Sequence, residues 1–176
     1  MLVEPRSWRS PQSVPYQKPP SECSALELAA FHALAVESGE VSAVGLEEKI
    51  QAAHRLIFSV HSRPLTGIAA VKNPLDSYRA KISRKAGVAL PKTEWPFELG
   101  WVFVAPAARE NGLSKRLVAC ALHGLVANIF ATARTDNDGM LRVLRRFDFL
   151  PYGADYESEE TPGARIQIFK RAAPSS

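Results

Sequence analysis

The sequence has few cysteines and no long apolar run, and these absences exclude several classes of protein. Cys23 and Cys120 are the only cysteines among 176 residues, so no disulfide framework is expected. No apolar stretch approaches the ~20 residues that cross a bilayer. The N-terminus lacks the basic-then-apolar order of a signal peptide. We therefore expect a cytoplasmic protein with no membrane partner.

Patterns for metals and nucleic acids are also missing. The chain has no Cys/His spacing typical of zinc and no arginine-rich run. Its net charge of +4 is a mild excess of cations, which suits a phosphate-rich small ligand as well as nucleic acid. The cations within residues 79–92 lack the interleaved exposed aromatics of a single-strand binder. We therefore expect no bound metal and no nucleic-acid partner. The formation of a homodimer remains a possibility.

What remains is the composition of an ordinary globular domain. Apolar residues make up 46% of the chain and charged residues 23%. The length suits one domain with a sizeable core. Five prolines within residues 1–21 fix φ and remove backbone donors, which predicts a flexible, extended or poorly ordered arm. We assign the domain to residues 22–171 and a short tail to residues 172–176.

Apolar periodicity predicts two helices, then strands that later alternate with helices. The expected helices lie within residues 24–39, 45–55, 77–87, 114–127 and 138–149. The expected strands are residues 55–60, 65–71, 97–106, 128–134, 150–157 and 165–171. Residues 73–96 interrupt the sheet. Pro106 ends the strand that begins at residue 97. This order predicts an α+β or mixed α/β fold around one central sheet.

The segment "ARENGLSKRL", residues 107–116, follows the most apolar strand and opens a helix. The first turn of a helix exposes unpaired N–H groups and the positive end of the dipole. Gly112 has no side chain, so an anion can approach the backbone closely. Ser114 adds a hydroxyl, and Arg109 and Lys115 add cations. Together these suit a pyrophosphate, although an ordinary strand–helix turn can carry the same glycine.

The wider segment "FELGWVFVAPAARENGLSKRLV" resembles the acetyl-CoA-binding motif of the GNAT superfamily of N-acetyltransferases. That motif is a strand, a bulge, and Arg/Gln-x-x-Gly-x-Gly/Ala opening a helix; this chain has Arg109-x-x-Gly112-x-Ser114. Downstream, "FATARTDNDGMLRVLRRFDF" resembles the next strand and helix, with Asn137 as the cofactor-facing asparagine. Asp148 replaces the usual glycine before the closing aromatic residue. The resemblance extends over about residues 24–171, with specific motifs in residues 97–149.

This resemblance implies a GNAT-like acyl-CoA N-acyltransferase fold, with a mixed, mostly antiparallel sheet flanked by helices and acetyl-CoA as cosubstrate. The backbone of Phe103 and Val104 would bond the acetyl carbonyl and the pantetheine arm, and Arg109 would contribute charge. The pyrophosphate would be bound by the N–H groups of the turn, namely those of Glu110, Asn111, Gly112, Leu113, Ser114 and Lys115.

Transfer of an acetyl group to an amine needs a neutral amine, a stabilised oxyanion and, ideally, an acid for the leaving thiolate. It needs no covalent nucleophile, and Cys120, mid-helix among apolar residues, is interpreted as a core thiol. Similar enzymes often carry a glutamate where Glu98 begins the cofactor strand. Glu98 is therefore the candidate general base, and a strand-end carboxylate facing solvent is the alternative.

The acid is harder to place. Many relatives have a tyrosine seven residues after the asparagine, but that position is Leu144 here. Tyr152 and Tyr156 on the following strand alternate onto one side and are the candidate acids, although packed tyrosines would show the same pattern.

The sequence thus predicts an N-acetyltransferase that moves an acetyl group from acetyl-CoA to a primary amine by direct attack, with no covalent enzyme intermediate. The acceptor would be a small-molecule or peptide amine. The alternative is a non-catalytic sensor that binds acyl-CoA, which the missing helix tyrosine and the departures at Ser114 and Asp148 support.

Overall fold

The computed structural model describes residues 14–60, 64–109 and 112–174. Its centre is a seven-stranded sheet with the order β1-β2-β3-β4-β5-β7-β6. The strands are β1 (Tyr16–Lys18), β2 (Arg55–Val60), β3 (Leu65–Lys72), β4 (Phe97–Val104), β5 (Ile129–Arg134), β6 (Leu150–Glu157) and β7 (Arg165–Arg171). The β4–β5 pair is parallel and the other pairs are antiparallel, so the predicted mixed, mostly antiparallel sheet is confirmed.

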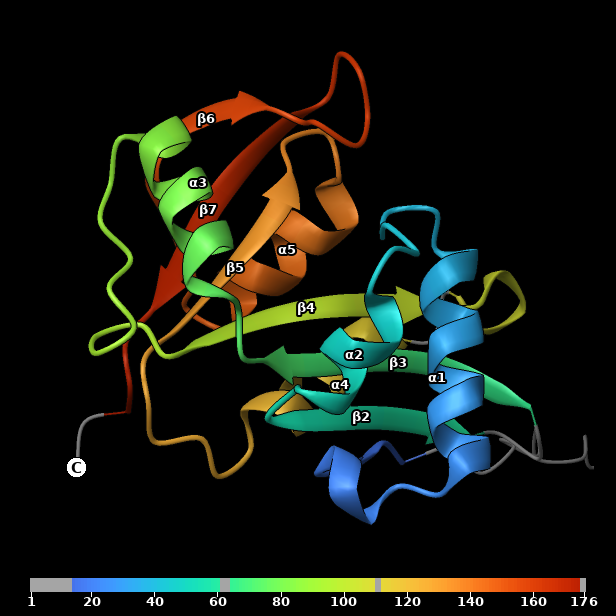
Figure 1. Ribbon diagram of the computed structural model, residues 1–176. Helices are drawn as coiled ribbons and strands as arrows, with labels where there is room; N and C mark the ends of the chain where they lie inside the picture. The colour runs from blue at the N-terminus through green and yellow to red at the C-terminus, as the bar shows by residue number, and fades with distance from the viewer. Residues whose placement is uncertain (1–13, 61–63, 110–111, 175–176) are drawn as a thin grey trace, which may run out of the picture.

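Helices cover both faces of the sheet (Figure 1). They are α1 (Ala25–Glu37), α2 (Leu46–Gln51), α3 (Asp76–Ala86), α4 (Leu113–Leu122) and α5 (Asp138–Arg146), with short 3-10 turns at Pro20–Glu22 and Pro106–Ala108. Helices α1, α2 and α3 lie on one face, and α4 and α5 lie on the other. The predicted helices and strands are therefore confirmed within a few residues at their ends.

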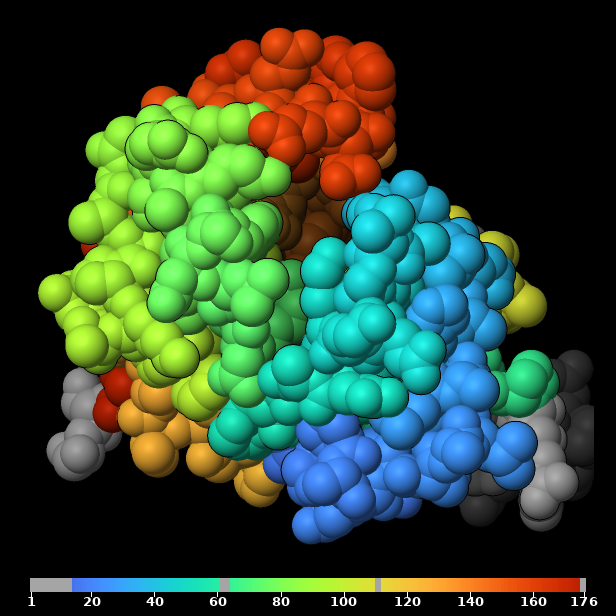
Figure 2. All heavy atoms as spheres, in the orientation of Figure 1, coloured from blue at the N-terminus to red at the C-terminus, as the bar shows by residue number. Residues whose placement is uncertain are grey.

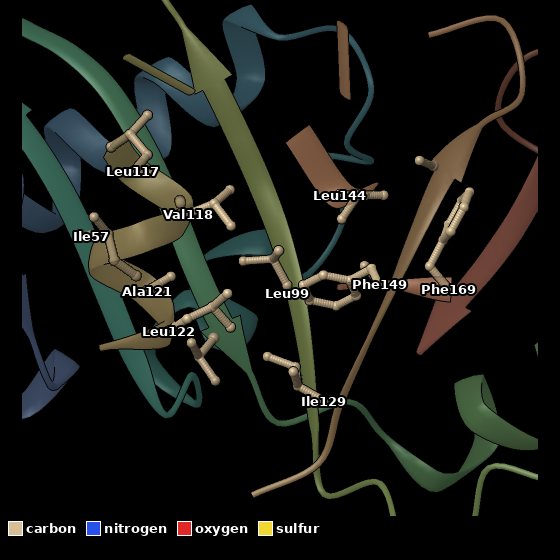
Figure 3. Close-up of a cluster of buried hydrophobic side chains, with 14 of the residues drawn as sticks. Ile57, Leu99, Leu117, Val118, Ala121, Leu122, Ile129, Leu144, Phe149 and Phe169 are labelled. Carbon is tan, nitrogen blue, oxygen red and sulfur yellow. The ribbon is translucent and has the colours of Figure 1, made fainter. Parts of the chain in front are cut away.

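The main core lies between the sheet and the α4–α5 layer (Figure 3). Alternate residues of the strands point into it, because successive side chains of a strand face opposite sides of the sheet. Its members include Ile57, Leu99, Leu117, Val118, Ala121, Leu122, Ile129, Leu144, Phe149 and Phe169. This packing fixes where α4 begins, at the carboxyl end of β4.

The N-terminal arm departs from the sequence prediction. Residues 16–18 form β1, which pairs with β2, and the ring of Tyr16 stacks on Phe58 with centroids 5.3 Å apart. Lys18 Nζ donates to Glu27 Oε1 of α1 at 2.7 Å. Residues 16–18 of the predicted arm, residues 1–21, are therefore part of the sheet, and the bounds of the domain stay a prediction. The prolines stand beside the strand and open the 3-10 turn, so they interrupt no ladder.

The two ends of the predicted insert, residues 73–96, are held together by Arg79 of α3. This side chain is 4% exposed and donates to four backbone carbonyls, those of Pro74, Leu90, Trp95 and Pro96. Buried carbonyls need donors, so one guanidinium fixes the whole loop. Helix α3 packs beside β6, over a small core that it shares with Phe130 of β5 and Ile168 of β7.

Two further cations of α3 are ion-paired rather than free for nucleic acid. Lys81 Nζ and Lys85 Nζ lie 2.7 and 2.6 Å from the carboxylate of Glu159, in the connection between β6 and β7. Arg79 is buried, and Lys81 and Lys85 are ion-paired, so three of the cations within residues 79–92 already have partners in the fold. No helix of the described residues is both long and apolar enough to span a bilayer.

Candidate functional site

Strands β4 and β5 start side by side and then diverge (Figure 1). Parallel pairing joins residues 97–99 of β4 to residues 129–131 of β5, and no pairing is present beyond Leu99. The later part of β4 therefore has an edge that faces away from β3 without a strand partner. Such an edge can hydrogen-bond an extended ligand through its backbone.

A β-bulge lies in the unpaired part of β4. Gly100 pairs with Ala70, whereas Phe103 pairs with Ile68, so two β4 residues oppose one residue of β3. The first of them, Trp101, has φ +51°, in the left-handed region that residues other than glycine rarely adopt. The bulge implied by the sequence resemblance is therefore present, and it turns the backbone of β4 locally.

The register beyond the bulge decides which backbone groups face the open edge. Ala105 N donates to Thr66 O at 2.9 Å. In an antiparallel ladder this bond places the N–H and C=O of Phe103 towards β3 and those of Val104 away from it. Arg109 Nε reaches Val104 O from that open side at 3.2 Å. The register thus favours Val104 over Phe103 as a backbone partner, while both assignments stay predictions.

A cavity of about 230 Å³ lies at the N-terminus of α4. The first helical bond runs from Arg116 N to Gly112 O, so the N–H groups of residues 113–115 have no partner within the helix. A Cβ placed on Gly112 would meet no atom within 4 Å, so the approach to the backbone is open. The cavity is lined by Val104, Arg109, Gly112, Leu113, Ser114, Lys115 and Val143.

Six of the predicted cofactor residues therefore lie around one cavity. Arg109 lies at its edge, with the guanidinium carbon 5.8 Å from the centre of the Phe103 ring. The side chains of Val104 and Leu113 are buried in the main core, so these two residues offer a ligand mainly their backbone. Glu110 and Asn111 lie outside the described residues.

On the opposite face of the sheet, Glu98 is buried, with 1% exposure. The alternative of a solvent-facing carboxylate is therefore wrong. Lys72 Nζ of β3 lies 2.9 Å from Glu98 Oε2. Tyr78 and Thr132 donate their hydroxyls to Oε1 at 3.1 and 3.3 Å. A buried carboxylate needs such partners, and here they come from three different elements.

Lys72 has aromatic neighbours as well. Its Nζ lies 5.2 Å from the centre of the Trp101 ring and 5.9 Å from that of Tyr78. The side chain is 20% exposed and lies so close over Gly100 that an added Cβ there would be 2.5 Å from Lys72 Cε. We call Lys72, Tyr78, Glu98, Trp101 and Thr132 the Lys72–Glu98 cluster. Sequence reasoning missed four of its members; the signal available was a lysine ending the apolar strand "LTGIAAVK".

Sequence comparison identifies no relative: no protein-family profile and no curated protein matches this chain. Comparison of the structure with solved structures does find similar proteins. An acyl-CoA N-acyltransferase from Pseudomonas aeruginosa superposes with a TM-score of 0.63 at 17% identity, over 91% of this chain and 99% of that one. Arabidopsis thaliana NAA60, in complex with a bisubstrate analogue, gives 0.64 at 14% identity, with 92% and 99% covered. Salmonella typhimurium yncA, solved with acetyl-CoA, gives 0.59 at 13% identity, with 94% and 96% covered.

The chain has the fold of acetyltransferases of the GNAT family. At these identities the likeness establishes the architecture alone. The chemistry of the site has to be argued from this chain's own residues.

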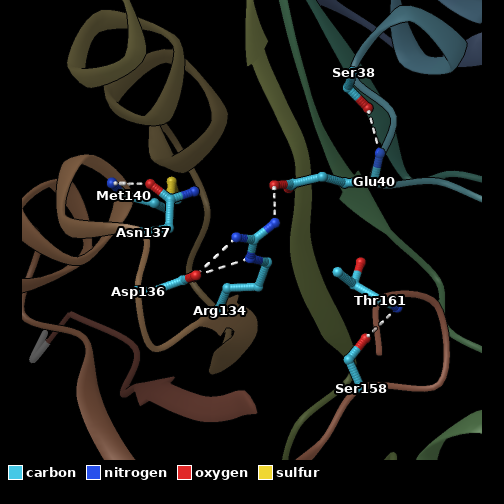
Figure 4. Close-up of polar contacts among 8 residues, drawn as sticks. All are labelled: Ser38, Glu40, Arg134, Asp136, Asn137, Met140, Ser158 and Thr161. Atoms are coloured by element: carbon cyan, nitrogen blue, oxygen red, sulfur yellow. Dashed lines mark hydrogen bonds and ion pairs between the residues drawn. The ribbon is translucent and has the colours of Figure 1, made fainter. Parts of the chain in front are cut away.

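Three positions that the GNAT resemblance singled out have local structural roles. Asn137 caps α5, because its Oδ1 accepts from Met140 N at 3.0 Å (Figure 4). Its predicted contact with the cofactor stays a prediction. Asp148, which replaces a glycine, has φ +61°, a conformation that Asp tolerates better than most residues. Leu144 is fully buried, so a core side chain fills the position of the missing tyrosine.

Tyr152 and Tyr156 pack against the same small core beneath α3, as the alternation predicted. The Tyr152 hydroxyl donates to Ala89 O at 3.1 Å. The pKa of Tyr156 is raised by burial and then by the negative charges of Glu98 and Glu159, so its hydroxyl stays protonated at neutral pH. The assignment of either tyrosine as the acid stays a prediction.

Figure 2 shows a hollow on the face that carries α1, α2 and α3. Around it lie α3, the segment between α1 and α2, and the end of the β6–β7 hairpin. Arg134 lies at the end of β5. Its Nη1 is 3.9 Å from Oε1 of Glu40 in the α1–α2 segment, and its Nη2 is 2.8 Å from Oδ2 of Asp136 (Figure 4).

Among the described residues, no group of three or more His, Cys, Asp or Glu side chains could hold a metal ion.

Proposed function

We propose that this protein is an N-acetyltransferase that moves an acetyl group from acetyl-CoA to a primary amine by direct attack, with no covalent enzyme intermediate. One observation supports it most: a cavity at the N-terminus of α4 adjoins the unpaired, bulged edge of β4. This combines an anion site with an edge for an extended arm, as a nucleotide joined to a long thioester requires.

The anion end of acetyl-CoA suits the cavity at α4. The backbone N–H groups of residues 113–115 and the charges of Arg109 and Lys115 would bind the pyrophosphate. The Val104 backbone would bond the pantetheine arm on the open edge of β4. The cosubstrate brings the reactive thioester, and the protein fixes its position against the sheet.

The acceptor end suits the Lys72–Glu98 cluster on the other face. An amine attacks as the neutral form, and Glu98 is the nearby carboxylate that can take its proton. Tyr156, protonated at neutral pH, would supply a proton towards the leaving thiolate. The hollow among α3, the α1–α2 segment and the β6–β7 hairpin would admit a small-molecule or peptide amine.

Cys120 supports transfer without a covalent enzyme intermediate. It packs against the main core, and burial raises the pKa of its thiol, which disfavours the reactive thiolate. Its sulfur lies 3.6 Å from the carbonyl oxygen of Pro15, next to β1. Direct attack by the amine needs no such nucleophile.

The first test is the melting temperature with CoA and with acetyl-CoA. A ligand that binds the native state at a hundredfold excess over Kd stabilises it by about 2.7 kcal/mol, so both should raise the melting temperature. An unmoved melting curve at millimolar CoA would contradict the proposal. Turnover with a panel of primary amines then separates an enzyme from a sensor, because a sensor would bind CoA and acetylate none of them.

A further inference from the structure

Within the Lys72–Glu98 cluster, Glu98, Trp101 and Tyr78 form a subsite suited to an ammonium group. The side chain of Lys72 occupies this subsite. Nζ of Lys72 lies 2.9 Å from Glu98 Oε2 and within 6 Å of the ring centres of both Trp101 and Tyr78. A carboxylate together with aromatic faces is the chemistry that recognises an alkylammonium group. The group held there is a primary amine, the functional group that the proposed reaction consumes.

The position of this amine along β4 matters as much as its partners. Lys72 lies across Gly100, directly before the bulge formed by Trp101 and Val102. At this point β4 leaves β5 and its open edge begins. A thioester bound along that edge would bring its carbonyl carbon to the same stretch of backbone. The Lys72 amine is thus next to the place where the acetyl group is expected.

Glu98 is also arranged to receive a proton from this amine. Its Oε1 already accepts two hydroxyls, from Tyr78 and Thr132. Its Oε2 is buried and accepts no hydrogen bond from the described residues, although the Lys72 ammonium lies beside it. The oxygen nearest the amine therefore has lone pairs to spare.

We propose that Lys72 is an autoacetylation site: acetyl-CoA bound in the cavity at α4 transfers its acetyl group to Lys72 Nζ of the same molecule. The inference rests on the proposed function. One proton passes from the ammonium to Glu98 and on to solvent, and the neutral amine attacks the thioester carbon. The N–C bond forms as the C–S bond breaks, and the second N–H proton ends on the CoA sulfur. The products are acetyl-lysine, CoA and one released proton.

Selectivity distinguishes this reaction from chemical acetylation of surface lysines. Lys81 is 44% exposed and Lys85 31%, whereas Lys72 is 20% exposed. Non-enzymatic reaction with acetyl-CoA would favour the more accessible amines, so modification concentrated at Lys72 needs the geometry of the site.

The test uses the full chain incubated with acetyl-CoA, followed by intact-mass measurement and peptide mapping. We expect one acetyl group, on Lys72, added at a first-order rate that does not change with protein concentration. Lys72→Arg should abolish it, whereas Lys92→Arg, the same change at an exposed loop position, should leave it unchanged. Glu98→Gln should slow it by ~10²–10⁴-fold, the usual contribution of a positioned base.

Three outcomes would overturn the inference in different ways. If CoA raises the melting temperature but Lys72 is no more acetylated than the exposed lysines, the autoacetylation proposal is wrong and the proposed function stands. If CoA leaves the melting temperature unmoved, the proposed function fails and the inference fails with it. A rate that rises with protein concentration would show transfer between molecules and would also contradict the proposal.

Discussion

Glu98 is both buried and charged, and its neighbours explain how the fold tolerates this. Moving a lone carboxylate out of water costs several kcal/mol, and a nearby cation with hydrogen-bond donors offsets that cost. Lys72 supplies the cation, and Tyr78 and Thr132 supply the donors. Burial and the negative charge of Glu98 raise the pKa of Tyr78, so its hydroxyl remains a donor at neutral pH.

Replacing Glu98 by Gln tests whether this carboxylate is the general base. We expect turnover with an amine acceptor to fall by ~10²–10⁴-fold, while the CoA-induced rise in melting temperature is retained. The carboxamide cannot take a proton from the amine. Raising the pH should recover part of the rate, because more of the amine is then already neutral.

The matched control is Glu94→Gln, which makes the same change at an exposed loop position. It should leave both turnover and CoA binding unchanged. Full activity of Glu98→Gln at neutral pH would show that another group deprotonates the amine. Loss of folding in the same variant would show that the carboxylate is mainly structural.

Sequence reasoning reached Glu98 but none of its partners, for a physical reason. Lys72, Tyr78 and Thr132 lie on β3, α3 and β5, and strand register and the placement of α3 bring them together. Local patterns predict which residues face a core, but not which strand end meets which helix. Asn137 is the opposite case: it was assigned only to the cofactor, although an N-cap residue type before an amphipathic helix was a signal present in the sequence.

At the scale of elements, the sequence predicted the helices and strands well because each carries its own periodicity. Strand β1 was missed because Pro15 and Pro19 flank it, and the arm offered too few residues to show alternation. The bulge at Trp101 was implied by resemblance alone, since no residue in "ELGWVFV" requires the left-handed conformation. Tertiary pairing, rather than local preference, decided both features.

Helix α3 depends on the buried Arg79, and removing that guanidinium should loosen the whole insert. We expect Arg79→Met to lower the free energy of unfolding by about 2–4 kcal/mol, because buried carbonyls lose their donor at a cost of ~1–3 kcal/mol each and water repays part of it. Urea unfolding measures this change. Arg84→Met, on an exposed position of the same helix, is the matched control and should change stability by less than about 0.5 kcal/mol.

The Arg79 variant also has a functional readout. Because Tyr78 precedes Arg79 on α3, a loosened helix should release the hydroxyl from Glu98 and slow turnover more than it weakens CoA binding. An Arg79→Met protein with normal stability and normal turnover would mean that the four carbonyl contacts do not hold the insert.

The stability that the Lys18–Glu27 ion pair between β1 and α1 contributes should depend on pH. The pKa of Glu27 is lowered from 4.5 to about 2, first by its hydrogen bond from Lys18 and then by the Ser24 N–H. A lowered folded-state pKa contributes stability above the unfolded value, and that contribution is lost as the pH falls from about 4.5 to about 2. We therefore expect Glu27→Gln to be less stable than the wild type at pH 7, with the difference vanishing near pH 2.

Thermal or urea unfolding across that pH range measures the effect. Glu22→Gln, at an exposed position in the 3-10 turn before α1, is the control and should follow the wild type at every pH. A stability difference at Glu27 that persists unchanged to pH 2 would show that the carboxylate charge is not what joins β1 to α1.

At the scale of the whole molecule, the two halves of the proposed reaction reach β4 from opposite faces of the sheet. The cavity at α4 lies on the face of the main core, and the Lys72–Glu98 cluster lies beneath α3 on the other. The divergence of β4 and β5 opens the sheet between them. A sequence cannot show this arrangement, because it follows from where pairing stops rather than from any single residue.

Gly112 offers the most direct test of the cofactor half. Its φ is +63°, and an added side chain would meet no atom within 4 Å, so a substitution costs backbone strain but no clash. We expect Gly112→Glu to weaken CoA binding at least about a hundredfold, or ~2.7 kcal/mol, because its carboxylate would repel phosphate at the helix N-terminus. Calorimetric titration with CoA gives the affinity.

Two control variants separate charge from strain. Gly112→Ala carries the same left-handed strain without a charge and should keep most of the affinity. Gly124→Glu adds the same charge at another left-handed glycine, φ +69°, beyond the C-terminal end of α4, and should bind CoA like the wild type. If both glutamate variants weaken binding equally, the effect is one of stability or net charge. If a folded Gly112→Glu protein binds CoA normally, the phosphates do not lie at α4, and the assignment of the cavity is wrong.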